Sequence, residues 1–103
     1  MAERWGGRRA QAVTRLVVER DGGVCHLCLL PGADSTDHLE PTSLGGSVWD
    51  MANMAAAHYS PCNASRHNRP LTPQLLASFR TASWHARVLG RSPVDATALF
   101  DGW

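Results

Sequence analysis

Three cysteines constrain the fold of this chain more than any other feature of its sequence. Two of them stand close together in the run Cys25-His26-Leu27-Cys28, and the third, Cys62, follows much later. Two thiolates at this spacing can wrap one tetrahedral metal ion. A chain of 103 residues also has a marginal hydrophobic core unless something staples it. Because three is an odd number and a reducing compartment keeps thiols free, we predict a structural zinc site rather than disulfides, with a histidine as the fourth ligand.

The charged residues are unevenly distributed along the chain. All ten basic residues are arginines, five within residues 1–20 and five within residues 66–91, whereas residues 21–65 carry acidic groups only. This segregation is typical of a protein that holds cations at its centre and phosphates around its edge, although ordinary solvated faces would explain it equally well. The start MAERWGGRRAQ has no apolar signal-peptide core, and no stretch approaches the roughly 18 apolar residues of a membrane span. We therefore expect a soluble, cytoplasmic protein.

The N-terminal half of the chain predicts one helix and one strand. Apolar spacing indicates an amphipathic helix over residues 8–20, which Asp21-Gly22-Gly23 brings to an end. Residues 34–39 indicate a short strand, and residues 40–50, with a proline and two glycines, an ordered loop.

The C-terminal half predicts helices. Residues 62–69 begin a short helix that Pro70 ends. Thr72-Pro73 is a helix cap followed by a proline at the first helical position, and the apolar stripe behind it predicts a helix to about Val88. Ser92-Pro93-Val94-Asp95 is a capping-box variant that predicts one more short helix. With no linker or repeat, residues 1–103 are expected to form a single α+β domain.

Short motifs fill the space between the cysteine pair and Cys62. They are Asp37-His38 with Pro41, the pair Gly45-Gly46, Asn53, and Cys62-Asn63 with Arg66. In this order and spacing, together with the cysteine pair, they resemble the HNH nuclease family, whose members fold as a ββα-metal module. The resemblance covers residues 20–70, about half of the chain.

The resemblance implies a fold for the middle of the chain. It places a zinc-stapled ββα-metal core at residues 22–70, between an N-terminal helical arm, 1–21, and a C-terminal helical arm, 71–103. Residues 53–57 would then form a strand, although their Met and Ala content favours a helix.

The resemblance also implies a role for each motif residue. His38 matches the general base, and an imidazole is largely unprotonated at neutral pH. Asn53 matches the residue whose amide braces the loop and orients His38. Asp37 and Asn63 match ligands of a catalytic divalent ion, and such hard oxygen ligands favour Mg²⁺ or Mn²⁺. His67, one helical turn beyond Asn63, could add a nitrogen ligand that also admits Ni²⁺.

The zinc site implied in this way takes its ligands from two segments of the chain. Its four ligands are Cys25, Cys28, His58 and Cys62. The family usually has two residues between the last histidine and cysteine, whereas this chain has three. His67 stays open as a catalytic ligand, a DNA contact or a substitute for His58 on zinc. His26, inside the cysteine pair, is interpreted as a solvent-facing filler.

These features together predict a divalent-metal-dependent DNA endonuclease or nickase with low sequence specificity. Four arginines are expected to contact the phosphates of double-stranded DNA, namely Arg8, Arg15, Arg66 and Arg69. Short free-standing family members occur beside phage packaging genes, so phage packaging or other DNA-processing proteins are expected partners, in a bacterial or phage-infected cell. The alternative is a non-catalytic zinc-stabilised DNA-binding or structural module, which needs the cysteines and arginines but not His38. Monomer and dimer both fit the sequence.

Overall fold

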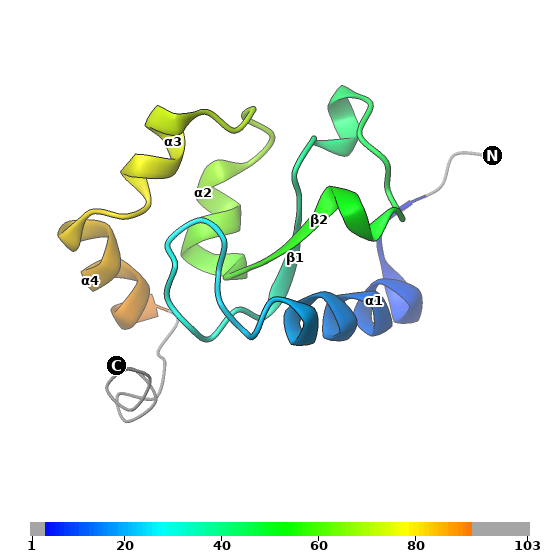
Figure 1. Cartoon of the computed structure of the whole chain (residues 1–103), viewed down its shortest axis with the longest axis horizontal. Coiled ribbons are helices and arrows are strands. Elements are labelled where there is room, and N and C mark those ends of the chain that lie inside the picture. The colour runs from blue at the N-terminus through cyan, green and yellow to red at the C-terminus, as the bar shows by residue number, and fades with distance from the viewer. Residues whose placement is uncertain (1–3, 92–103) are drawn as a thin grey trace.

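The chain folds around two short strands, as a computed structural model describes for residues 4–91. In chain order the elements are α1 (Gly7–Arg20), β1 (Ser35–His38), β2 (Met54–Ala57), α2 (Ala64–Arg66), α3 (Pro73–Ser78) and α4 (Ala82–Arg91). Three helical turns join them, at Thr42–Leu44, Met51–Asn53 and Tyr59–Asn63. Figure 1 shows the strands in the middle of the molecule, with α1 running beneath them and α3 and α4 beyond α2. The predicted α+β class, with an N-terminal helix and C-terminal helices, is confirmed.

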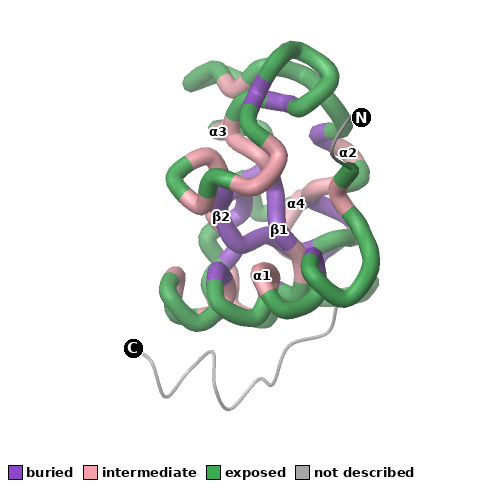
Figure 2. The backbone as a smooth tube through the Cα atoms, turned by 90° about the vertical axis from the view of Figure 1, so that its right-hand side faces the viewer, coloured by how far each residue is buried: buried purple, intermediate pink, exposed green. Residues whose placement is uncertain are grey.

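The two strands pair antiparallel and form the centre of the core. Ser35 lies opposite Ala57, and His38 lies opposite Met54. Every residue of β2 is buried, as Figure 2 shows by the colour of that segment. The strand predicted against local propensity is thus confirmed, because tertiary packing overrides the weak helical preference of Met and Ala. Small side chains on β2 let α1, which packs on it, approach closely.

The end of α1 is tied to β2 by the pair Arg20 and Asp21. The Arg20 guanidinium donates to the carbonyls of Met51 and Met54, at 2.8 and 2.6 Å. Asp21 accepts a hydrogen bond from the backbone nitrogen of Ala56 at 2.8 Å. The hydrogen bond from Arg20, with help from that of Ala56, holds the pKa of the Asp21 carboxyl below its usual value. The predicted helix of residues 8–20 therefore ends where its last charged groups join the sheet.

The C-terminal helical region differs from the prediction. Instead of one helix reaching Val88, the chain forms α3 and α4 with a break between them. Thr72 caps α3 as predicted, accepting from Leu75 at 3.0 Å. Thr81 then caps α4, because its hydroxyl accepts from the backbone nitrogen of Trp84 at 3.1 Å. This second cap stops the first helix and starts another. The helix predicted after Ser92 lies outside the described residues.

No helix within residues 4–91 combines the length and the apolar character that crossing a bilayer requires.

Candidate functional site

Three cysteines and one histidine meet in the core. Ligand atoms of Cys25, Cys28, His58 and Cys62 all lie within 4.8 Å of one another, and all four residues are buried. The first two come from the turn between α1 and β1, where the Val24 and Pro31 backbones form an isolated bridge. His58 follows β2 directly, and Cys62 lies in the helical turn after it. Segments far apart in sequence thus converge on one point.

The orientation of His58 suits metal binding. Its Nε2 lies 2.8 Å from the Pro31 carbonyl oxygen, which can only accept, so Nε2 carries the proton and donates. Its Nδ1 therefore offers a lone pair toward the sulfurs, at 3.3 Å from Cys28 Sγ and 3.8 Å from Cys62 Sγ. Tetrahedral zinc with ordinary bond lengths places nitrogen and sulfur ligands about 3.6 Å apart. The two observed distances bracket that value.

The three residues between His58 and Cys62 are accommodated by a wide turn. The backbone nitrogen of Asn63 donates to the His58 carbonyl at 2.9 Å, which is the spacing of a π-helix. A π-turn absorbs one extra residue without moving the residues that flank it. The longer spacing is therefore compatible with all four ligands facing one ion.

The electrostatics of the cluster call for a cation. Hydrogen bonds from Cys28 and Cys62 lower the pKa of the Cys25 thiol. Hydrogen bonds with Cys25 and Cys28 raise the pKa of the Cys62 thiol. Burial lowers the pKa of His58, but hydrogen bonds to the Cys25 and Cys28 sulfurs outweigh it and raise the pKa to about 10. A buried thiolate therefore retains a positive partner, and a metal ion can replace the proton in that role. The cluster could hold a metal ion such as zinc.

Residues of the C-terminal helices enclose this cluster, which the sequence did not indicate. Trp84 Nε1 donates to Cys62 Sγ at 3.3 Å, and His85 Nε2 donates to the Cys28 carbonyl at 2.9 Å. Arg80 donates to the Leu27 carbonyl at 3.0 Å. Such donors around a ligand sulfur and its backbone fix the ligands in place. Only their closeness in sequence, with Trp84 and His85 on α4 and Arg80 just before it, hinted at a common surface.

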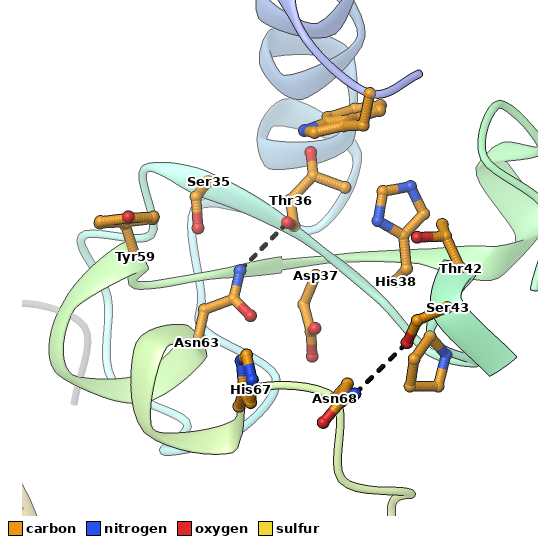
Figure 3. Close-up of a pocket in the computed structure, with 12 residues that line it drawn as sticks. Ser35, Thr36, Asp37, His38, Thr42, Ser43, Tyr59, Asn63, His67 and Asn68 are labelled. Carbon is orange, nitrogen blue, oxygen red and sulfur yellow. Dashed lines mark hydrogen bonds between the residues drawn. The ribbon is translucent and has the colours of Figure 1, made fainter. Parts of the chain in front are cut away.

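A pocket of about 320 Å³ opens beside β1. Figure 3 shows that most of its polar lining comes from β1, the turn at Thr42–Leu44 and the segment around α2. Four residues named from the sequence line it, namely Asp37, His38, Asn63 and His67. The structure therefore brings the expected catalytic residue and the expected catalytic-ion ligands to one place.

His38 presents one free nitrogen to this pocket. Its Nε2 lies 2.9 Å from the Val48 carbonyl oxygen and, for the same reason as His58, carries the proton. Nδ1 is then the unprotonated nitrogen, the form that a general base requires. The Trp5 ring packs against the imidazole edge to face, with centroids 4.8 Å apart. Both contacts restrict the rotation of the ring.

Asn53 holds together the loop that carries Val48. Its amide oxygen accepts from the Glu40 backbone nitrogen at 2.9 Å, and its nitrogen donates to the carbonyls of Glu40 and Ser47, at 3.1 and 2.9 Å. The loop closes tightly here, because a Cβ on Gly46 would overlap the Glu40 carbonyl. Asn53 lies outside the pocket lining and reaches His38 only through this loop.

Asn63 and His67 lie on the opposite wall from His38. The Asn63 amide nitrogen donates to the Thr36 carbonyl at 3.2 Å, which leaves its oxygen turned toward the space beside Asp37. His67 lies below it in Figure 3, with the left-handed backbone angle φ of 57°. The Cys25–Cys62 cluster uses His58 and not His67. His67 therefore belongs to the pocket.

Asp37 is held by two donors, and both of them correct the sequence interpretation. Arg66 Nη1 donates to Asp37 Oδ1 at 2.7 Å, and His26 Nε2 lies 2.6 Å from Asp37 Oδ2. Arg66 was expected to contact phosphate, but its side chain is fully buried and its remaining donors bind the His38, Leu39 and Arg69 carbonyls. His26 was expected to face solvent as a filler, which is wrong because it contacts a buried carboxylate. Arg66 is thus a buried residue that holds Asp37 in place at the pocket.

The other arginines expected at DNA remain on the surface. Arg8 and Arg15 are exposed on α1. Arg69 is exposed as well, although two of its nitrogens donate to the Ser65 and Arg66 carbonyls at the end of α2. These three side chains are accessible to a large polyanion.

The described residues thus form a buried Cys/His cluster and a polar pocket beside β1. Comparison of the chain with protein-family models, curated proteins and solved structures found no match.

Proposed function

We propose that the chain is a divalent-metal-dependent DNA endonuclease or nickase, of the HNH type that its motifs resemble. The observation that carries the proposal is the pocket lined by His38, whose Nε2 is engaged by the Val48 carbonyl, together with Asp37, Asn63 and His67. A base, oxygen ligands and an imidazole around one cavity are the groups that phosphodiester hydrolysis needs. The Cys25–Cys62 cluster would hold structural zinc next to it, in the same small domain.

In this mechanism His38 acts on water. Its Nδ1 takes a proton as the water oxygen attacks phosphorus, and the bond from phosphorus to the 3′ oxygen breaks. That oxygen takes a proton from solvent, which leaves 5′-phosphate and 3′-hydroxyl ends. The Val48 carbonyl holds Nε2–H and stabilises the imidazolium that forms, since it accepts a hydrogen bond from either state. Asn53 contributes indirectly, because its hydrogen bond to the Ser47 carbonyl fixes the loop that carries Val48.

The donor set formed by Asp37, Asn63 and His67 fits a catalytic cation. Asp37 and Asn63 offer oxygens, His67 offers a nitrogen, and each oxygen of Asp37 keeps a second lone pair beyond its present hydrogen bond. Oxygen ligands favour Mg²⁺ or Mn²⁺, and the imidazole would also admit Ni²⁺. When bound, such an ion supplies positive charge beside the scissile phosphate and the departing oxygen.

The charge balance of the pocket suggests how substrate contributes. Arg66 already neutralises Asp37, so the described lining offers a cation little net negative charge. A DNA phosphate would supply it, and the exposed Arg8, Arg15 and Arg69 would hold the flanking phosphates. Backbone contacts of this kind carry no base information, which fits low sequence specificity on double-stranded DNA. Proteins of phage packaging or of other DNA processing are the partners that would direct such an activity.

The test is nicking of supercoiled plasmid DNA. The purified chain is incubated with Mg²⁺, Mn²⁺, Ni²⁺, Zn²⁺ or chelator, beside the variants His38→Ala and Gln74→Ala. The second variant is the control, because Gln74 is exposed on α3 and lines neither the pocket nor the Cys/His cluster. Loss of the general base should reduce the rate by about 10²–10⁴-fold, while the control retains wild-type nicking.

Two outcomes would refute the proposal. Nicking that persists at full rate in His38→Ala or in chelator would exclude the mechanism. DNA binding without nicking in any metal would leave the non-catalytic zinc-stabilised module as the function.

A further inference from the structure

His26 is fixed in space by its backbone before its side chain is considered. It lies inside the turn that carries Cys25 and Cys28. Its backbone nitrogen donates to the Ala56 carbonyl of β2 at 2.9 Å, and its carbonyl accepts from Arg80 at 3.0 Å. One residue thus joins the metal-ligand turn, the sheet and the C-terminal helical region.

The side chain of His26 points from that turn to the neighbouring pocket. Its Nε2 lies 2.6 Å from Asp37 Oδ2, a carboxylate that is only 4% exposed. Because a carboxylate accepts, Nε2 is the donor in this contact. Arg66 holds the other oxygen, so the carboxylate is clamped between a charged donor from α2 and an imidazole from the cysteine turn.

We propose that His26 is a positioning residue that couples the Cys/His cluster to the pocket by fixing the orientation of Asp37. This role rests on the proposed function, because it assumes that Asp37 is a ligand of the catalytic ion. Without His26, the carboxylate is free to turn both oxygens onto the Arg66 guanidinium, which pairs with carboxylates in that two-bond geometry. An oxygen that faces Arg66 no longer faces the pocket. Neighbours that orient a metal ligand in this way contribute about 10–100-fold in metal affinity.

The experiment measures Mn²⁺ affinity directly, by the loss of the free-ion electron paramagnetic resonance signal. The full-length zinc-loaded chain is titrated as wild type, His26→Ala, His26→Gln and Asp37→Asn. The Gln amide nitrogen can take the place of Nε2 as a donor. Gln74→Ala is the control, since Gln74 is exposed on α3 and lines neither the pocket nor the Cys/His cluster.

The expected pattern separates positioning from general damage to the fold. Mn²⁺ affinity falls about 10-fold or more in His26→Ala, recovers in His26→Gln and is unchanged in Gln74→Ala, with zinc content equal in all variants. The Mn²⁺ concentration that gives half-maximal nicking shifts in parallel, while the rate at saturating Mn²⁺ changes little. A purely structural role would instead lower zinc content and thermal stability.

The failures are distinguishable. If wild type binds Mn²⁺ through Asp37 and His26→Ala binds it as tightly, the positioning role is refuted and the proposed function stands. If wild type binds no Mn²⁺ with or without DNA, or Asp37→Asn binds as well as wild type, the proposed catalytic site is refuted and the role of His26 with it.

Discussion

Replacing Arg66 with Ala distinguishes a phosphate-binding arginine from one that holds the fold. The Arg66 side chain is fully buried, and its guanidinium donates to Asp37 Oδ1 and to the His38 and Leu39 carbonyls at 2.7 Å each. Truncation would strand the Asp37 carboxylate without its charged partner. It would also leave two carbonyls of the strand end without donors.

The size of the effect follows from that burial. Removing one partner of a buried, hydrogen-bonded ion pair costs about 3–5 kcal/mol. The free energy of unfolding of a domain this size is about 5–15 kcal/mol, so roughly a fifth of it or more is lost. Each kcal/mol shifts the melting temperature of such a domain by about 4–8 °C, and the loss should therefore lower it by at least about 12 °C.

The assay is thermal unfolding of the metal-loaded chain, followed by circular dichroism. Arg8→Ala is the control, because Arg8 is exposed on α1 and its loss should cost less than about 0.5 kcal/mol. Arg66→Lys keeps the charge but not the planar fork, so an intermediate melting temperature is expected. If Arg66→Ala melts with the wild type while its DNA affinity falls, the structural role assigned to Arg66 is refuted.

Two further predictions concern the metal and the pH. Chelation of the ion in the Cys25–Cys62 cluster should unfold the chain, because structural zinc supplies about 10–16 kcal/mol, as much as the whole domain's stability; far-ultraviolet circular dichroism that is unchanged after verified metal removal would contradict this. The pKa of Asp21 is lowered, first by its hydrogen bond with Arg20, so its stabilisation is present above the unfolded value near 3.8 and lost as pH falls through the folded pKa. Wild type should therefore exceed Asp21→Asn in stability by about 1 kcal/mol at pH 6, and in urea titrations the difference should shrink as the pH falls below 3.8; a difference that does not shrink in acid would refute the ionic origin.

Local chemistry explains which elements the sequence could predict. The prediction of the first helix was accurate, because its apolar spacing and the Asp21-Gly22-Gly23 stop act on neighbouring residues. The strand Met54–Ala57 required the family resemblance, since its alanines favour a helix and only burial against α1 makes them a strand. The break before α4 had a local signal, the cap residue Thr81, which the continuous apolar stripe concealed.

The candidate site shows a similar division. Residue type and spacing were enough to name the three cysteines and to call for a histidine, and the family resemblance pointed to His58 while His67 stayed open. The four members of the Cys/His cluster lie within 4.8 Å of one another. The neighbours of Asp37 were beyond such reasoning, because Arg66 is 29 residues away along the chain and its burial depends on the complete fold. His26 was misread for the same reason: its side chain has a partner only when β1 lies beside the cysteine turn.

The position of Arg80, Trp84 and His85 bears on where this domain can be cut. Arg80 and His85 contact the cysteine turn, and Trp84 contacts Cys62. A chain shortened after Pro70 would retain every motif residue, yet Cys62 would lose its indole donor and the Cys28 carbonyl its imidazole. The buried cluster would then open to water on that side. The recognisable motif is therefore shorter than the autonomous folding unit, and any excised fragment meant to keep its metal must extend through α4.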